Sequence, residues 1–249
     1  MRGLILEKVV LDREVFIYLP EGYKTNDKKY PVIYVLDGDK FKKIFNELID
    51  YIEDEFLKRS LEEHIIVGIT PKNRVNEYTP WFSKALDKRF QDFKGNGGEY
   101  LDFLSGYLQV YIESEFRVNK DKKDRKIMGY SLGALVSLYS IYKNDDYGEI
   151  ASICASQWYE NWIKFINEEN MLNNDFKLIM IAGRNEGKNK ITIHKYLPKL
   201  SEESYEIFKR RIGIKNVKMV WDEYDHHENV LNRYKIALEF LLSKKVLNK

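Results

Sequence analysis

The sequence has little of the chemistry that cross-links a chain or anchors it in a membrane. Cys154 is the single cysteine among 249 residues, so an internal disulfide is impossible and a cysteine-ligated zinc site is not expected. No stretch approaches the roughly 18 uninterrupted apolar residues that a membrane-spanning helix requires. These features argue against a disulfide-stabilised scaffold and a membrane-spanning protein, and we expect neither a metal nor a cofactor.

An excess of charge of one sign is also lacking. The 41 basic and 39 acidic residues leave a net charge of +2, and no basic block indicates a nucleic-acid partner. Near the N-terminus, the apolar run is interrupted by charge too early for a signal peptide. We therefore expect a cytoplasmic protein with neither a nucleic-acid nor a membrane partner. Removal of a leader remains open, and the oligomeric state is not indicated.

The order of apolar segments predicts the fold class. With 44% hydrophobic and 32% charged residues, the chain can bury a core, and its length suits one domain over residues 1–249. Short apolar runs alternate with helical patterns, which predicts βαβ units and an α/β fold. We expect a mainly parallel sheet of about eight strands with helices on both faces. The predicted strands are two segments within 4–19, then 31–36, 64–69, 125–130, 150–155, 177–183 and 217–221, and the predicted helices are 40–58, 98–116, 131–142, 158–168, 192–211 and 228–244. Residues 71–96 show little periodicity and are expected to form a lid or substrate loop.

A candidate nucleophile lies where a short apolar strand meets an apolar helix. The motif reads Gly129-Tyr130-Ser131-Leu132-Gly133. Glycines beside such a serine allow a sharp, strained turn that raises the hydroxyl out of the sheet, and the N–H of Leu132 is left free to stabilise an oxyanion. A chance cluster of small residues is the alternative, but the strand-to-helix context is typical of an α/β-hydrolase fold.

A serine hydroxyl needs a general base, and a histidine pair lies at the expected place. His226 and His227 follow the last predicted strand and precede the last helix. Catalytic residues of such sheets lie at the carboxyl ends of strands, which argues against His64 at a strand start and His194 near a helix start. Helix capping or metal binding are the alternatives for the pair, and no third ligand of suitable spacing supports a metal.

An acid must orient the imidazole, and Glu186 is the first candidate. It follows the predicted strand 177–183, which fits the chain order serine, acid, histidine. Asp222 and Asp225 are rivals, but they lie on the same strand-to-loop segment as the histidines. Glu186 could alternatively be one of many solvated carboxylates.

A second oxyanion donor is expected after the strand 31–36. There the sequence reads Asp37-Gly38-Asp39, and we take the backbone N–H of Asp39 as the candidate. The alternative is that Gly38 only provides a tight exit from the strand.

Taken together, these motifs resemble the esterase D or putative esterase family of α/β hydrolases. The resemblance covers nearly the whole chain, and its closest likeness is to bacterial esterases that open the trilactone of catecholate siderophores. The matching segments are Val35-Leu36-Asp37-Gly38-Asp39, Glu77-Tyr78-Thr79-Pro80-Trp81, Gly97 to Leu104, the nucleophile motif, and Asp225-His226-His227-Glu228-Asn229-Val230.

Alignment of the terminal histidine motif with these relatives selects His227 as the base. Two positions depart from the family pattern: Ala134 replaces a second glycine, and Ala155-Ser156-Gln157-Trp158 replaces serine-proline-serine before the tryptophan. These departures leave the three predicted catalytic positions intact, but they leave the substrate open, because other family members act on S-formylglutathione, feruloyl or acetyl esters, or transfer mycolyl groups.

The resemblance implies a serine carboxylic ester hydrolase that works through an acyl-enzyme, with siderophore-type or aromatic acyl esters as its candidate substrates. Trp81, Trp158 and Tyr130 are candidate walls of an acyl pocket, and Arg74 is a candidate partner for an anionic substrate. These residues could instead be ordinary core aromatics and a solvated arginine. An acyltransferase with the same residues and a non-catalytic binding protein are the alternative functions.

Overall fold

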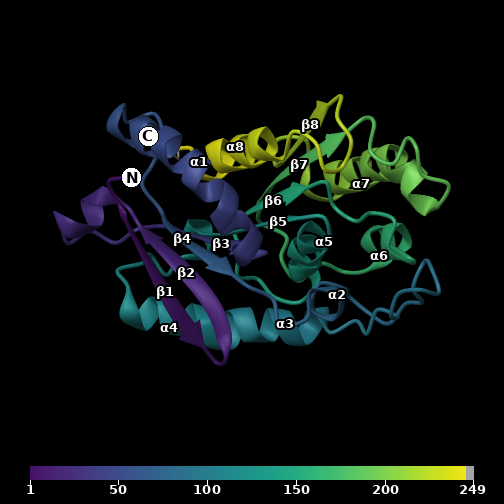
Figure 1. Ribbon diagram of the computed structural model, residues 1–249, viewed down its shortest axis with the longest axis horizontal. Helices are drawn as coiled ribbons and strands as arrows, with labels where there is room; N and C mark the ends of the chain where they lie inside the picture. Colours follow the sequence, from purple (N-terminus) through teal and green to yellow (C-terminus); the bar gives the residue numbers. More distant parts are fainter. Residues whose placement is uncertain (245–249) are drawn as a thin grey trace.

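The computed structural model describes residues 1–244, which contain an eight-stranded sheet in the order β1-β2-β4-β3-β5-β6-β7-β8 (Figure 1). β1 pairs antiparallel with β2, and β2 with β4, whereas the pairs from β4 through β3 to β8 are parallel. The strands are β1 (Leu4–Val10), β2 (Arg13–Leu19), β3 (Val32–Leu36), β4 (Ile65–Ile69), β5 (Arg125–Tyr130), β6 (Glu149–Ile153), β7 (Lys177–Gly183) and β8 (Val217–Asp222). The predicted α/β class and mainly parallel sheet are confirmed, while positions 245–249 of the predicted domain lie outside the described residues.

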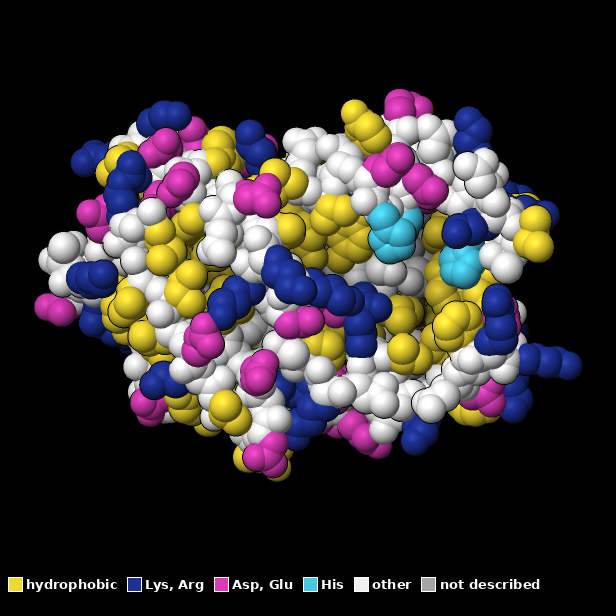
Figure 2. All heavy atoms as spheres, in the orientation of Figure 1, with side chains coloured by type: hydrophobic (Ala, Val, Ile, Leu, Met, Phe, Trp, Pro, Cys, Tyr) yellow, Lys and Arg dark blue, Asp and Glu magenta, His cyan; other side chains and the backbone are white. Residues whose placement is uncertain are grey.

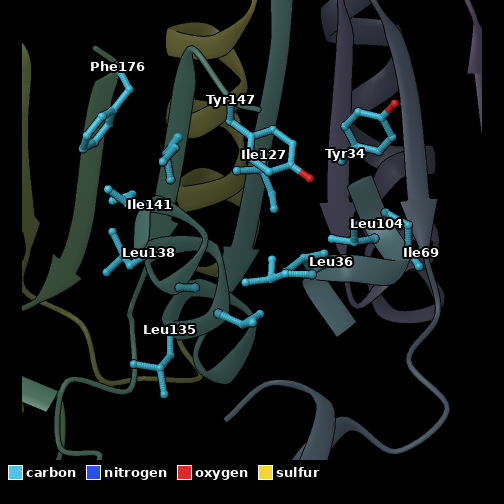
Figure 3. Packing of buried hydrophobic residues seen from close by; sticks show 14 of the residues in the cluster. Tyr34, Leu36, Ile69, Leu104, Ile127, Leu135, Leu138, Ile141, Tyr147 and Phe176 are labelled. Carbon is cyan, nitrogen blue, oxygen red and sulfur yellow. The ribbon is translucent and has the colours of Figure 1, made fainter. Parts of the chain in front are cut away.

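Helices cover both faces of the sheet. One hydrophobic cluster packs β2 to β7 against α1 (Gly38–Leu57) and α8 (Val230–Leu241), which lie near each other in Figure 1. A second cluster fills the opposite face, and Figure 3 shows part of it, with side chains from β3, β5 and the following helix meeting between the layers. The helices of this second face are α3 (Gly97–Phe103), α4 (Gln109–Glu115), α5 (Leu132–Tyr139), α6 (Trp162–Glu168) and α7 (Leu197–Ile212).

The predicted helix 98–116 is continuous but not uniform. A π-helical turn, η2 (Leu104–Leu108), joins α3 to α4, and Leu101, Leu104, Leu108 and Ile112 all remain buried against the sheet. The described 3₁₀ turns are η1 (Glu21–Lys24), η3 (Lys122–Asp124), η4 (Ser140–Tyr142) and η5 (Ile193–Tyr196). None of the helices within residues 1–244 combines the length and apolar character needed to cross a bilayer.

The segment 71–96 is mostly irregular, as its sequence predicts. Its one described helix is α2 (Arg74–Glu77), and an isolated bridge joins Ser83 to Phe93. Arg13 of β2 donates two hydrogen bonds of 2.9 Å to the Glu77 carboxylate and so fastens α2 to the sheet. The beginning of the segment is therefore held in place next to the strand ends.

The carboxyl ends of the parallel strands β5 to β8 meet at one end of the sheet. Because β5, β6, β7 and β8 run parallel, the residues that follow them emerge on the same side. Pairing extends to Gly183 opposite Asp222, so the loops after β7 and β8 begin side by side. In open parallel sheets, functional sites lie at the carboxyl ends of the strands, so a site is expected here.

Candidate active site

Ser131 occupies a strained turn between β5 and α5. Its backbone angles are φ 60° and ψ −118°, an unusual conformation for a residue with a side chain. A Cβ at Gly129 would lie 2.3 Å from the carbonyl carbon of Gly133, so only glycine fits on the strand side of the turn. At Gly133 the nearest atom to such a Cβ is an oxygen of Asp37 at 3.3 Å, which is a milder constraint. The local structure therefore has the form that the motif predicts.

A chain of hydrogen-bonding contacts joins Ser131, His226 and Glu186. The Nε2 atom of His226 lies 3.1 Å from the Ser131 hydroxyl oxygen, and its Nδ1 atom lies 2.7 Å from Oε2 of Glu186. The three side chains come from the ends of β5, β7 and β8. Their order along the chain is serine, acid, histidine, which is the order found in α/β hydrolases.

The histidine in this position is His226, not His227, so the prediction that selected His227 is corrected. His227 is exposed, and its ring meets the edge of the His226 ring at a centroid distance of 4.8 Å. Adjacent residues in a loop project their side chains in different directions, so only one of the pair can lie between Ser131 and Glu186. An alignment of isolated motifs does not record that direction.

Glu186 is buried and remains an acceptor. Burial opposes its ionisation, but hydrogen bonds from His226, the Gly183 N–H at 2.8 Å and Cys154 lower the pKa of its carboxyl below the usual range. Glu186 is thus held as a carboxylate beside the imidazole.

The two rival acids have other partners. Asp222 accepts two hydrogen bonds of 2.7 Å from Arg233. Asp225 accepts from the backbone N–H groups of Gly187 at 3.0 Å and His226 at 2.7 Å. Neither carboxylate contacts the imidazole, so the geometry favours Glu186.

The lowered pKa of Glu186 gives a testable effect on stability. A carboxyl whose pKa is lower in the folded than in the unfolded protein stabilises the fold above the unfolded value, about 4.3. This contribution is lost as the pH falls through the folded pKa. We expect Glu186→Gln to be less stable than wild type at pH 7, by roughly 1 kcal/mol or more, because charge-assisted hydrogen bonds to the carboxylate are lost. The difference should shrink below about pH 4. Urea unfolding at both pH values measures it.

The matched control is Glu202→Gln, which changes an exposed carboxylate of α7. A stability difference between wild type and Glu186→Gln that stayed constant from pH 7 to pH 3.5 would contradict the assignment of Glu186 as a stabilised carboxylate.

A second hydroxyl contacts the candidate nucleophile. Because the Glu186 carboxylate accepts from Nδ1, the neutral imidazole presents Nε2 as an acceptor and Ser131 donates to it. The Ser131 oxygen can then accept from Ser156, whose hydroxyl oxygen lies 3.3 Å away. The Ser156 N–H also donates to the Ser131 carbonyl at 3.2 Å. Sequence reasoning noticed the segment around Ser156 only as a departure from a family pattern, although it follows β6, which pairs directly with β5.

The two predicted oxyanion donors are placed differently by the structure. Leu132 is the first residue of α5 and lines the same cleft as Ser131. Asp39 is the second residue of α1, which begins directly after β3, and β3 is the neighbour of β5. Asp39, however, borders a separate hollow beside β1 and β2 and is not among the residues that line the cleft. The role of the Asp39 N–H therefore remains a proposal.

Ser131 opens into a cleft of about 820 Å³. One wall comes from residues 73–93 and the other from residues 187–197 and 225–227. Figure 2 shows histidine side chains beside a hollow on one face, with hydrophobic, basic and acidic side chains around them. The apolar lining residues are Val75, Ala85, Leu86, Phe90, Phe93, Leu132, Trp158 and Leu197, and the basic or imidazole groups are Arg74, Lys190, His194, His226 and His227. Lys190 and Phe90 were not identified from the sequence, and His194 was considered there only as a base and set aside.

Two of the four predicted substrate residues reach this cleft. Trp158 and Arg74 line it, but Arg74 is already paired with Asp37, through contacts of 2.6 and 2.7 Å. Trp81 does not reach the cleft: it packs against Phe165 at a centroid distance of 4.9 Å. Tyr130 is also buried, and its hydroxyl donates to the carbonyl of His226. Trp81 is partly buried at the border of the core, whereas Tyr130 is buried within it.

Cys154, Glu186 and His226 form the one cluster of possible metal ligands within residues 1–244. Their ligand atoms lie within 4.8 Å of one another. Burial, followed by the nearby Glu186 charge, raises the pKa of the Cys154 thiol well above its usual value, so the thiolate that a metal requires is disfavoured. A protonated Cys154 thiol suits a hydrogen-bonded cluster better than a metal centre. We therefore propose that the reaction at Ser131 needs no metal.

Comparison with known proteins identifies the family of this chain. A sequence model of the Putative esterase family matches residues 8–206. The chain belongs to the Putative esterase family. Membership in this family supports an esterase, and hence a hydrolase, function.

Individual similar proteins match nearly the whole chain. The uncharacterized protein YbbA of Bacillus subtilis (strain 168) is 31% identical over 248 residues, which cover 98% of each chain. Among solved structures, an IroE-like serine hydrolase from Shewanella oneidensis superposes with a TM-score of 0.78 at 22% identity, covering 96% of this chain and 80% of that one. The siderophore hydrolase EstA from Aspergillus nidulans gives a TM-score of 0.72 at 16% identity, covering 96% and 94%. At these identities the two structures establish a shared fold.

Proposed function

We propose that this protein is a serine carboxylic ester hydrolase that works through Ser131, His226 and Glu186. The observation that carries the proposal is the unbroken contact path from the Ser131 hydroxyl to Nε2 of His226, and from Nδ1 to the buried Glu186 carboxylate. A serine polarised in this way can attack an ester carbonyl, which it cannot do unaided at neutral pH.

The proposed reaction has two acyl-transfer steps. His226 takes the proton of Ser131 as its oxygen attacks the carbonyl carbon, and the N–H groups of Leu132 and Asp39 stabilise the resulting oxyanion. His226 then gives the proton to the leaving alcohol. Water, activated by the same imidazole, releases the acid from Ser131. Glu186 holds the imidazole in the required tautomer throughout.

The cleft favours an ester with an aromatic and anionic acyl or alcohol part. Phe90, Phe93 and Trp158 offer ring surfaces and Lys190 supplies positive charge, whereas Arg74 is paired with Asp37. EstA, one of the structural relatives, is a siderophore hydrolase, which makes siderophore-type esters the first substrates to examine. The cleft volume of about 820 Å³ suits a substrate larger than a simple acetyl ester.

We further propose that the chain acts as one cytoplasmic hydrolase domain in which residues 71–96 form a substrate loop. This segment contributes much of one cleft wall, including Arg74, Leu86 and Phe90. Near the start of the segment, helix α2 is held to the sheet by the hydrogen bonds from Arg13 to Glu77. The tip of the segment carries exposed apolar side chains, among them Phe90, which is 71% exposed. Such a surface can cover a bound ester.

A fluorophosphonate probe tests the proposed nucleophile. We expect the folded protein to gain one covalent phosphonyl group, with peptide mass spectrometry placing it on Ser131. Protein unfolded in urea should not react, because the path from Ser131 to His226 exists only in the fold. A folded protein that remained unlabelled would contradict the hydrolase and favour a binding function. Assays with aromatic, acetyl and siderophore trilactone esters then define the substrate.

A further inference from the structure

A buried arginine lies behind the candidate active site. Arg233 of α8 is fully buried, and its Nε and Nη2 atoms each donate to the Asp222 carboxylate at 2.7 Å. Asp222 is the last residue of β8, so this ion pair joins α8 to the strand that leads into the histidine loop. A guanidinium removed from water needs such a partner, which makes the position of Arg233 well defined.

The remaining donors of Arg233 contact the backbone of the histidine loop. Nη1 donates to the carbonyls of Asp225 at 3.1 Å and His226 at 3.3 Å, and Nη2 donates to the carbonyl of Tyr224 at 3.3 Å. Gly183 leaves room for this packing, because a Cβ there would lie 2.0 Å from the Tyr224 oxygen and 2.5 Å from Nη2 of Arg233. One rigid, planar group therefore fixes three consecutive carbonyls.

Tyr130 connects the same network to the nucleophile. Its hydroxyl donates to the His226 carbonyl and accepts from Nη1 of Arg233 at 2.9 Å. Tyr130 immediately precedes Ser131 in the chain. The main chain of the serine and the main chain of the histidine are thus joined through one phenol, independently of the contact between their side chains.

We propose that Arg233 and Tyr130 are positioning residues that hold the His226 main chain at the distance from Ser131 required for proton transfer. The proposal rests on the proposed ester hydrolysis. Neither side chain lines the cleft, so neither is expected to touch the substrate. A displacement of about 1 Å in a catalytic group can lower a rate by about 10²-fold, so loss of this network should affect kcat rather than KM.

The test uses Tyr130→Phe, which removes only the hydroxyl, and Arg233→Lys, which keeps the charge opposite Asp222. Tyr234→Phe is the matched control, because Tyr234 is also a buried tyrosine. Its ring stacks on that of Tyr130 with a distance of 5.7 Å between the ring centroids. We expect Tyr130→Phe to lower kcat and the fluorophosphonate labelling rate by about tenfold or more, with KM unchanged. Tyr234→Phe should match wild type. Circular dichroism and assays well below the melting temperature separate these effects from unfolding, and Tyr130→Phe remains informative if Arg233→Lys does not fold.

A second measurement separates this proposal from the proposed function. Nitrogen-15 NMR of the imidazoles reports which His226 nitrogen carries the proton, whether or not any ester is hydrolysed. We expect the wild type to hold the proton on Nδ1 and Tyr130→Phe to show a mixture of tautomers. Wild-type kcat together with wild-type His226 shifts in Tyr130→Phe would overturn the proposal. Altered shifts in Tyr130→Phe alone, in a protein inactive on every ester and probe, would support the positioning network and contradict the hydrolase.

Discussion

Replacing His226 by alanine is expected to lower kcat/KM for a carboxylic ester by about 10⁴- to 10⁶-fold. The reason is that no other base lies within hydrogen-bonding distance of the Ser131 hydroxyl among residues 1–244, since its two described side-chain contacts are with His226 and Ser156. A hydroxyl such as Ser156 cannot take the proton at neutral pH. Steady-state kinetics on an activated aryl ester measure the loss.

The neighbouring histidine supplies the matched control. His227→Ala also removes one imidazole from the cleft, but it leaves the path from Ser131 to Glu186 intact. Its kcat should stay within about tenfold of the wild-type value, and a change larger than about tenfold is expected only in KM. Equal losses in the two variants, or a larger loss in His227→Ala, would refute the assignment of His226 as the base.

The second large effect concerns Ser131 and how it combines with His226. Ser131→Ala should lower kcat by about 10⁴- to 10⁶-fold, and the double variant Ser131→Ala/His226→Ala should be no slower than either single variant within about tenfold. When two residues act in the same proton transfer, removing either one abolishes that step. The activation free-energy changes of the two single variants therefore do not add in the double variant. Single-turnover measurements with the same ester on all three variants provide the comparison.

The control for this pair is Ser114→Ala, which changes an exposed serine of α4. It should retain wild-type kinetics. A double variant slower than both single variants by the product of their separate effects would show that Ser131 and His226 act independently and would contradict the acyl-enzyme mechanism.

The sequence predicted the sheet because its central strands are short apolar runs separated by helical patterns. Buried strands such as Val32–Leu36 and Ile65–Ile69 have no polar alternation, and this pattern depends only on local sequence. The turn at Ser131 was predictable for the same reason, because flanking glycines and the change from strand to helix are both visible in a few residues.

The choice between His226 and His227 was not accessible in the same way. It depends on where a side chain points after β8. Asp225 and Arg233 lie near the histidines in the sequence, but Tyr130 and Glu186, which also contact His226, come from distant parts of the chain. Trp81 illustrates the same limit, since a tryptophan in a family motif can equally line a cleft or, as here, pack against aromatic rings elsewhere. Contacts between distant segments decide both cases.

The position of β8 at the edge of the sheet has a consequence for how the protein loses function. β8 pairs on one side with β7 and carries the loop that holds His226, whereas β5, which leads into Ser131, lies in the interior of the sheet. Edge strands can open while the centre of a sheet remains folded. A fluctuation that releases β8 would separate the base from the nucleophile without exposing the main core. Inactivation should therefore precede global unfolding as denaturant is raised.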